Sequence, residues 1–413
     1  MKKTSLKSRR TFFYHIFCLS GIYQNGSCCR LKRRGVVPGV EVLLNQKIHL
    51  IRGKKIGLIT NQTGVDRRLK NNIDLLNSTP GVNLVSLFSP EHGIQGLEQA
   101  GVKVKNKIEN SQKLPIFSLY GKNIIPTSRM LYDVDLLVYD IQDVGSRYYT
   151  YLSTLKNCLK AAHQHGIPFM VLDRPNPLGG LTLEGKILKQ RLHSFVGPSS
   201  IPPRYGLTPG ELALWMKAEM KLKNSLIVVR MAQWERKHWY DETDLEWIPP
   251  SPNVPTSKTA LLYAGTCLIE GTNLSEGRGT TIPFEVVGAP WIDGMKLANS
   301  MGKFKLPGVV FRKTTFIPTF SKYSGEKCQG VQLHVTNREQ FKPVQTVLCL
   351  ISFIHSSYFN KFKWVNPHFD RLAGSEEIRQ SIQDEQSIGI IVEEWQQELE
   401  QFQQERKKFL LYP

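Results

Sequence analysis

Short apolar runs that end abruptly in polar clusters recur along the first half of the chain. They lie at residues 56–59, 84–88, 116–119, 136–139 and 169–172. Runs of this length are typical of strands that are buried on both faces of a sheet. The helical or loop returns between them predict βαβ units and a mostly parallel sheet, with a further strand at residues 226–230.

Each apolar run is followed by a cluster of polar residues, at 60–64, 89–93, 120–121, 140–147 and 173–177. Right-handed crossovers bring the carboxyl ends of parallel strands to one edge of the sheet, where ligands bind in open α/β sheets. Glu91 and His92 follow the second run directly and are therefore site candidates. Unrelated solvated loops are the alternative, but such loops have no reason to favour Asp, Arg, Asn and His over Lys and Ser.

Helical spacing predicts a helix over residues 148–163 that begins with Tyr148, Tyr149 and Tyr151. These rings suit either a sugar-binding platform or core packing. A capping box at Thr208 predicts a second helix from Pro209 to about residue 223.

The later part of the chain has weaker periodicity. Residues 249–291 are rich in Pro, Gly, Asn and Thr but retain apolar residues, so we expect a long irregular segment with a functional role. Strands are expected at 309–311 and 331–335, a helix after Ser375, and an amphipathic helix over 393–408. We expect a basic leader at 1–34, a catalytic domain at 35–230 and a C-terminal α+β domain at 231–413.

The formal net charge of +19 is concentrated at the N-terminus, since residues 1–34 hold nine Lys or Arg and no acid. The remaining basic residues are dispersed, which argues against nucleic-acid binding. The leader has the order of a secretory signal, with a basic start and an apolar middle, although no cleavage site is clear. We expect an extracytoplasmic protein if it acts as a signal and a cytoplasmic one otherwise; membrane contact would involve the leader alone. The seven cysteines are too widely spread for a disulfide framework.

Carboxylates and arginines dominate the polar clusters. The candidates are Glu91, His92, Asp140, Asp143, Asp173, Glu270, Glu276, Arg147, Arg174 and Arg278. Several carboxylates around one crevice suit cleavage of a glycosidic bond, which needs a proton donor and a second carboxylate. Arginines beside them can hold a carboxylate of the substrate in bidentate fashion.

Other chemistries fit the sequence less well. There is no HExxH zinc motif, although Glu91, His92 and Asp143 match a metal site loosely, so a metal-assisted hydrolase remains an alternative. Residues 144–148 lack the second glycine of a Gly-x-Ser-x-Gly elbow, and residues 60–64 are not a dinucleotide-binding loop. We therefore expect neither a metal nor another cofactor.

Seven motifs stand in order along residues 40–413, and together they resemble the NamZ family of exo-β-N-acetylmuramidases. They read GLITNQTG at 57–64, SPEHG at 89–93, DIQDVGSRYYTY at 140–151, DRPNP at 173–177, PSPN at 250–253, EGTN at 270–273 and GRGT at 277–280. The resemblance implies a Rossmann-like N-terminal domain, a smaller C-terminal domain and a cleft between them. It also implies release of terminal N-acetylmuramic acid from the non-reducing end of peptidoglycan fragments.

The resemblance assigns the catalytic role to Glu91, and we expect a general acid that His92 either orients or tunes in its pKa. Glu276 or Asp143 would be the second carboxylate, and Arg147 or Arg278 would hold the lactyl carboxylate of muramic acid. The remaining residues expected to bind substrate are Asn61, Tyr148, Tyr149, Asp173, Arg174, Asn176, Asn253 and Asn273. Tyr205 departs from the pattern, because an Arg-His-Gly motif would place histidine there, on the rim of the site. A carbohydrate-binding or wall-associated protein without catalysis is the alternative from another class.

Overall fold

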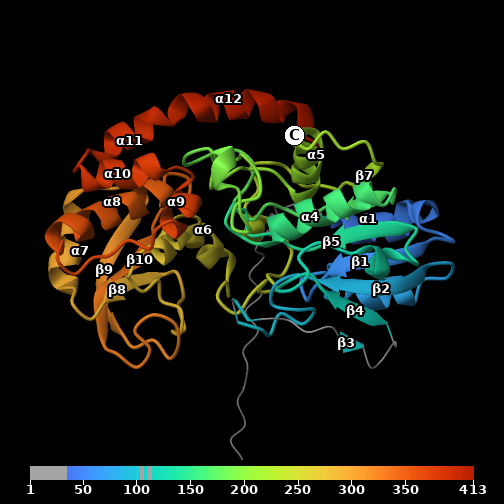
Figure 1. The fold of residues 1–413 in the computed structure, drawn as a ribbon, viewed down its shortest axis with the longest axis horizontal. Coiled ribbons are helices and arrows are strands. Elements are labelled where there is room, and N and C mark those ends of the chain that lie inside the picture. The colour runs from blue at the N-terminus through green and yellow to red at the C-terminus, as the bar shows by residue number, and fades with distance from the viewer. Residues whose placement is uncertain (1–34, 100, 103–106, 109–113) are drawn as a thin grey trace, which may run out of the picture. The chain divides into compact units, whose positions relative to one another are not determined.

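The computed structural model describes residues 35–99, 101–102, 107–108 and 114–413 (Figure 1). Residues Gly35–Pro413 form one compact unit. The leader expected at residues 1–34 lies outside the described residues. Within the described ranges, no helix has both the length and the apolar character needed to cross a membrane.

The first half of the described chain forms a seven-stranded sheet in the order β3-β4-β2-β1-β5-β6-β7. Its strands are β1 (Lys55–Thr60), β2 (Asn83–Ser89), β3 (Lys107–Ile108), β4 (Pro115–Ser118), β5 (Leu136–Asp140), β6 (Phe169–Leu172) and β7 (Leu226–Val229). All neighbours pair in parallel except the short edge strand β3, which is antiparallel to β4. The six parallel strands match the predicted runs to within one residue at each end, so the predicted parallel α/β sheet is confirmed.

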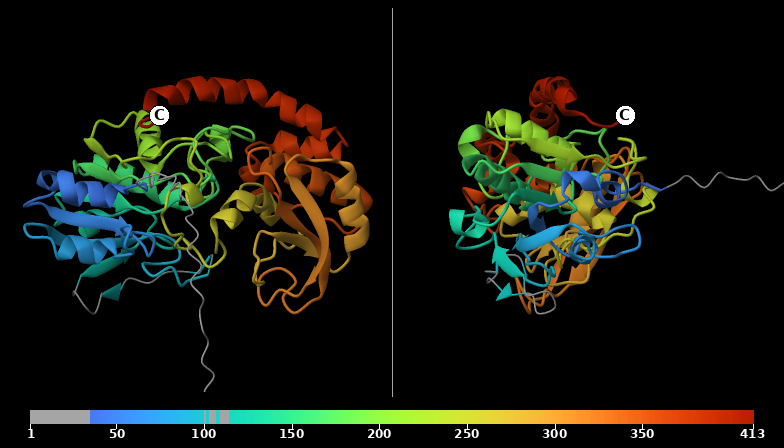
Figure 2. Two further views of the ribbon diagram at one scale, coloured as in Figure 1. Left: turned by 180° about the vertical axis from the view of Figure 1, so that it is seen from behind. Right: turned by 90° about the vertical axis from the view of Figure 1, so that its right-hand side faces the viewer.

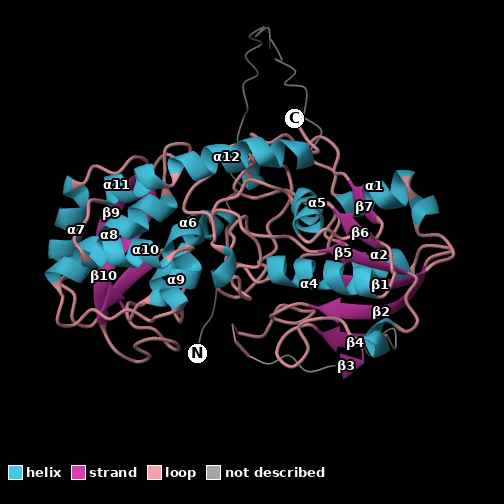
Figure 3. Cartoon of the chain, turned by 45° about the horizontal axis from the view of Figure 1, so that its top comes forward, coloured by secondary structure: helices cyan, strands magenta, loops and turns pink. Residues whose placement is uncertain are grey.

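Both faces of this sheet are covered by helices (Figure 3). Leu136 and Val138 of β5 point into a core with residues of α1 (Gly39–Gln46) and α2 (Asn72–Asn77). Leu137 and Tyr139 point into the opposite core, with α4 (Tyr151–Gln164) and α5 (Pro209–Glu219). Because successive side chains of a strand face opposite ways, a strand covered on both sides must be apolar throughout, which explains the unbroken runs.

The second half of the chain forms an antiparallel sheet in the order β8-β10-β9, from β8 (Val286–Ala289), β9 (Val309–Phe316) and β10 (Cys328–Val335). Helix α7 (Gly294–Lys303) packs against β9 and β10. The expected smaller α+β part is thereby confirmed. The other helices of the described chain are α3 (Ser128–Leu131), α6 (Ser257–Thr266), α8 (Pro343–Ser357), α9 (His368–Ala373), α10 (Glu376–Gln383), α11 (Ile388–Glu394) and α12 (Gln396–Arg406).

Several expectations about the second half are wrong. Residues 249–291 are not irregular throughout, since they contain α6, a 3-10 helix at Cys267–Gly271 and β8. Helix α6 is buried at eight successive residues, so it lacks the apolar stripe by which a surface helix is recognised. The helix expected over 393–408 is α11 and α12, which meet at Trp395.

Two helices of the first half are shorter than expected. Helix α4 begins at Tyr151, so Tyr148 and Tyr149 lie in the loop before it. Helix α5 begins at the predicted capping box of Thr208 but ends at Glu219.

The C-terminal end of the chain returns to the parallel sheet. Helix α12 runs from the C-terminal helices toward α5 (Figures 1 and 2). There, Trp215 of α5 makes edge-on ring contacts with Phe402 and Phe409. Beyond the helix, the Tyr412 hydroxyl donates to the Asp173 carboxylate at the end of β6. The last residues of the chain therefore pack against the parallel-sheet half: Phe402 joins the core that contains α4 and α5, and Tyr412 joins a small separate core with Val36, Met231 and Trp234.

Candidate active site

A cavity of about 220 Å³ lies beyond the carboxyl ends of β2, β4 and β5, where loops from both halves of the chain meet. Glu91 and His92 enter it from the loop that begins at Pro90, directly after β2. Its walls include Glu91, His92, Tyr120, Tyr148, Tyr149, Thr150, Ser251, Asn253, Tyr263, Glu270, Arg278 and Phe284. The second half of the chain thus supplies a cation and a carboxylate to a site that begins at the sheet edge.

Glu91 is buried, and both of its carboxylate oxygens are held. Oε1 accepts a hydrogen bond from the backbone N–H of Gly101 at 3.0 Å, and Oε2 accepts one from the Thr150 hydroxyl at 2.6 Å. The Tyr120 phenol also lies against Glu91; burial, then the charge of Glu91 and a hydrogen bond to it, raise the pKa of Tyr120 to about 12. The carboxylate is therefore fixed in one orientation by groups from three loops.

His92 lies in a constrained loop. Its backbone φ of 71° lies in the left-handed region, which is uncommon for a residue other than glycine. Nδ1 lies 2.7 Å from the backbone oxygen of Glu98, so this nitrogen carries the proton and Nε2 is the acceptor. Burial and the positive charge of Arg278 lower the pKa of His92, partly opposed by Glu91 and by the bond to Glu98.

Arg278 lies between two carboxylates and between two cavities. Its Nη2 donates to Oε1 of Glu270 at 2.7 Å, and its Nε lies 3.4 Å from Oε1 of Glu276. Arg278 and Glu270 also line a second cavity of about 460 Å³, with Glu276, Lys322 and His368. The two cavities therefore adjoin through this ion pair.

The charges of this cluster are strongly coupled. Burial alone would raise the pKa of Glu270, but the charge of Arg278 and its hydrogen bond, with the nearby His368, lower that pKa to about 2. Lys322 donates to Oε2 of Glu276 at 3.1 Å. Glu270 therefore carries its negative charge at neutral pH.

Aromatic and amide side chains complete the first cavity. Tyr148 and Tyr149 are buried in its wall, and the Tyr148 hydroxyl has no hydrogen-bond partner among the described residues. Asn253 donates from Nδ2 to the Gln99 side chain at 3.1 Å, across the two halves of the chain. A buried hydroxyl without a partner is available to a polar group of a ligand.

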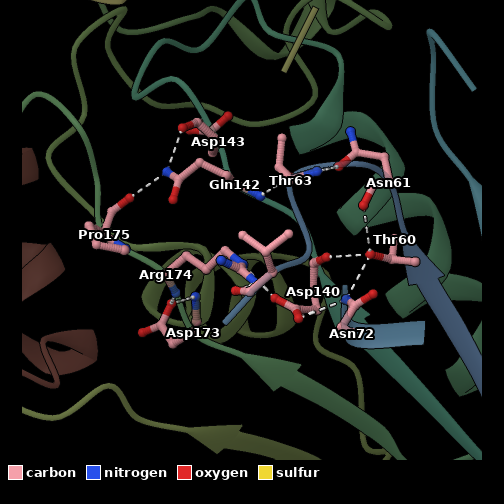
Figure 4. Close-up of polar contacts among 12 residues, drawn as sticks. Thr60, Asn61, Thr63, Asn72, Asp140, Gln142, Asp143, Asp173, Arg174 and Pro175 are labelled. Atoms are coloured by element: carbon pink, nitrogen blue, oxygen red, sulfur yellow. Dashed lines mark hydrogen bonds and ion pairs between the residues drawn. The ribbon is translucent and has the colours of Figure 1, made fainter. Parts of the chain in front are cut away.

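Other predicted site residues do not line the cavity and lie instead in a buried polar network (Figure 4). Arg174 donates from Nε to Asp140 and from Nη2 to the backbone oxygen of Val65. Asp140 also accepts from the Asn72 amide at 2.8 Å. These contacts join the ends of β1, β5 and β6, so the network holds the carboxyl edge of the sheet together.

Asn61, Asp173 and Asn176 are also committed to internal bonds. Asn61 donates to the Tyr151 hydroxyl at 2.8 Å, and Asn176 donates to the backbone oxygen of Leu207 at 2.9 Å. Asp173 accepts from the backbone N–H of Gly210 at 2.8 Å and from three further donors, the backbone N–H of Arg174 and the hydroxyls of Thr208 and Tyr412. Burial raises the pKa of Asp173 to about 7 despite these donors.

Asp143 is buried and does not line the cavity. It accepts hydrogen bonds from the backbone N–H of Gly145 at 2.8 Å and from the Tyr205 hydroxyl. Burial raises the pKa of Asp143 to about 6, although these bonds oppose the shift. Tyr205 is itself fully buried, so the residue that departs from the expected histidine contacts this carboxylate and does not lie on a rim.

Arg147 and Asn273 are likewise engaged with backbone groups. The buried Arg147 guanidinium donates to the carbonyls of Lys186, Ile201 and Leu372. Asn273 donates to the carbonyl of Lys361 at 2.9 Å and accepts from the N–H of Lys363 at 2.8 Å. Both side chains hold loops together, and neither lines the two cavities. Within the described ranges, the site included, no group of three or more His, Cys, Asp or Glu is arranged to hold a metal ion.

Comparison with known families decides the identity of this fold and cavity. Residues 56–258 match the family model of the N-terminal part of exo-β-N-acetylmuramidase NamZ, and residues 261–412 match that of its C-terminal part. The chain belongs to the NamZ family. This confirms the resemblance drawn from the motifs and makes the chain an exo-β-N-acetylmuramidase, which is a glycosidase.

Similar proteins extend the match over nearly the whole chain. The peptidoglycan β-N-acetylmuramidase NamZ of Bacillus subtilis (strain 168) is 46% identical over 382 residues, which cover 92% of each chain. A solved DUF1343 family protein from Bacteroides fragilis NCTC 9343 is 38% identical with a TM-score of 0.85, covering 92% of this chain and 99% of its own. A second such protein from that organism is 30% identical with a TM-score of 0.72, covering 91% and 99%.

The cavity of this NamZ family chain also contains residues outside the predicted set. Thr150 and Ser251 belong to motifs that hold predicted residues, and Tyr120 begins the polar cluster after the third apolar run, so their position was a usable signal. Tyr263 and Lys322 had no such signal. Tyr263 lies within the buried helix α6, and Lys322 lies 44 residues beyond Arg278 in the chain, in a loop between β9 and β10.

Proposed function

We propose that this NamZ family chain hydrolyses the glycosidic bond of a terminal N-acetylmuramic acid at the non-reducing end of peptidoglycan fragments. Glu91 is the general acid, which gives its proton to the glycosidic oxygen as the bond to the anomeric carbon breaks. The peptidoglycan β-N-acetylmuramidase of Bacillus subtilis, to which the chain is 46% identical, supports the substrate, and the position of Glu91 in a cavity supports the role.

The observation that carries the proposal is the hydrogen bonding of Glu91. Oε1 accepts from a backbone N–H, which has no lone pair to offer, so the proton of the neutral acid resides on Oε2. Beside Oε2 is the Thr150 hydroxyl, which can accept as well as donate. The acid can therefore hold its proton on a defined oxygen and turn it toward the leaving group without losing its anchor at Gly101.

The walls of the two cavities suggest how the sugar is held. Tyr148 and Tyr149 offer ring faces and a free hydroxyl, and Asn253 offers an amide at the opposite wall. Arg278 binds the lactyl carboxylate that distinguishes muramic acid from glucosamine, because its guanidinium lies on the wall of both cavities. His92 stabilises the orientation of the loop that carries Glu91.

The test is release of free N-acetylmuramic acid from the disaccharide MurNAc-GlcNAc by the purified full-length chain and by Glu91→Gln. General acid catalysis contributes about 10²–10⁴-fold, and we expect a loss of that size in the variant. Glu98→Gln is the matched control, since it removes a carboxylate from the same loop but keeps the backbone carbonyl that holds His92. A folded wild type that binds the disaccharide without turnover would instead support the carbohydrate-binding alternative.

A further inference from the structure

Cleavage of a glycosidic bond by two carboxylates requires one near the leaving group and another near the anomeric carbon. Besides Glu91, three carboxylates lie in or close to the site: Asp143, Glu270 and Glu276. The sequence alone leaves open whether Asp143 or Glu276 is the second carboxylate. The three differ in whether a substrate in the cavity of Glu91 can reach them.

Access favours Glu270. It lines the 220 Å³ cavity together with Glu91 and also lines the adjoining 460 Å³ cavity, whereas Glu276 lines only the larger one. The Glu270 side chain is 23% exposed, against 2% for Glu276. Asp143 is 5% exposed and lines neither cavity. A substrate bound against Glu91 therefore meets Glu270 on the same walls.

The contacts of Glu270 leave one oxygen for chemistry. Oε1 accepts from Nη2 of Arg278 at 2.7 Å, while Oε2 lies 3.9 Å from Nε2 of His368. The guanidinium keeps the carboxylate ionised and fixes its plane. The ion pair with Arg278 lowers the pKa of Glu270 below its ordinary value, and a carboxylate that stays ionised suits a nucleophile that attacks as an anion and later departs.

We propose that Glu270 is the catalytic nucleophile of this hydrolysis, an inference that rests on the proposed function. Oε2 of Glu270 bonds to the anomeric carbon as the bond to the leaving sugar breaks, and the leaving oxygen takes the proton of Glu91. Water then gives a proton to the Glu91 carboxylate and attacks the anomeric carbon. The bond to Glu270 breaks, its electron pair returns to the carboxylate, and the anomeric configuration is retained.

The first experiment follows the anomer of N-acetylmuramic acid that wild-type enzyme releases from MurNAc-GlcNAc, by proton NMR before mutarotation. We expect the β anomer. Turnover with inversion to the α anomer would overturn the role of Glu270 as a nucleophile while leaving the proposed function intact. An inert wild type would overturn the proposed function itself, and this inference with it.

The second experiment compares Glu270→Ala with Glu276→Ala on 4-nitrophenyl β-N-acetylmuraminide, with and without azide. The control removes a carboxylate that pairs with the same Arg278, so it reproduces the electrostatic disturbance. We expect Glu270→Ala to lose about 10³-fold or more in kcat and to form the α-glycosyl azide when azide is added. Glu276→Ala should lose less than about tenfold and form no azide product. Equal losses in both variants, without an azide product, contradict the proposal.

A third measurement decides the matter if either variant fails to fold. Wild-type enzyme is incubated with 5-fluoro-N-acetylmuraminyl fluoride, whose glycosyl-enzyme intermediate turns over slowly, and then digested for peptide mass mapping. The added mass should fall on the peptide that contains Glu270. Labelling of another carboxylate, or no labelling at all, would refute the nucleophile.

Discussion

Thr150→Val is the substitution that most directly tests how Glu91 is held. The Thr150 hydroxyl donates to Oε2 of Glu91 at 2.6 Å, and valine keeps the shape of the side chain while removing that donor. A hydroxyl donor stabilises a charged carboxylate more than the neutral acid. Its removal therefore makes Glu91 hold its proton to higher pH, and a general acid is active only while it is protonated.

The size of the effect follows from the two charge states of Glu91. A hydrogen bond to a charged group contributes about 1.5–3 kcal/mol and a neutral one about 0.5–1.5 kcal/mol, so the difference is about 1–1.5 kcal/mol. At about 1.4 kcal/mol per pH unit, the alkaline limb of the profile should move upward by about one unit. Because Gly101 and Tyr120 still contact Glu91, the limb should not move much further.

The assay is the pH dependence of kcat/KM for MurNAc-GlcNAc, whose poor leaving group requires an acid. Thr154→Val is the matched control, since Thr154 lies in the next turn of α4 and its hydroxyl contacts the backbone oxygen of Thr150 instead of Glu91. An alkaline limb that stays in place or moves downward in Thr150→Val, or an equal shift in the control, would refute the reasoning.

Three further predictions concern recognition and stability. Selectivity is measured as the ratio of kcat/KM values for N-acetylmuraminides and N-acetylglucosaminides. Arg278→Gln should reduce this ratio by about tenfold or more, as expected for a lost charged hydrogen bond, whereas Arg147→Gln should keep it. An unchanged ratio in both variants would show that neither arginine holds the lactyl group. Tyr412→Phe removes the hydroxyl that donates to Asp173 and should lower the free energy of unfolding by about 1.5–3 kcal/mol, measured by urea denaturation, so an unchanged midpoint would contradict it. Burial raises the pKa of Glu184 to about 7, so the folded chain binds this proton more tightly than the unfolded chain does; its stabilising effect is complete below about pH 4 and is lost as the pH rises through about 7. Glu184→Gln should therefore flatten the decline in stability between about pH 5 and pH 8, and an equally steep decline would count against this.

The parallel sheet could be predicted because the apolar residues of each strand reflect how that strand is buried. A strand such as β5 is apolar at successive positions only when both faces are covered, and helices α1 and α4 cover them here. Helices α6 and α8 were not predicted, because burial on nearly all sides removes the alternation of apolar and polar residues that identifies a helix. They are buried around most of their circumference, so neither shows the polar face that marks a helix on the surface.

The site could be predicted in part. Glu91 and His92 were found because a polar pair directly after a buried strand must lie at the edge of the sheet. The sequence does not predict whether a polar side chain at that edge faces the cavity or a neighbouring side chain. Arg174 has the residue type of a substrate ligand, yet its guanidinium binds Asp140 at the base of the same edge.

The sequence by itself determined the α/β class, the order of the strands along the chain and the loop that carries Glu91, because these depend on residues close together in the chain. The tertiary structure decided which charges meet. Glu91 and Glu270 share a cavity, and Asp173 binds Tyr412, which lies 239 residues further along the chain. The sequence around one member of each pair does not indicate the other member. Buried carboxylates, amides and guanidinium groups form hydrogen bonds with one another, whereas those on a cavity wall can bind substrate. Only the fold determines which of these occurs.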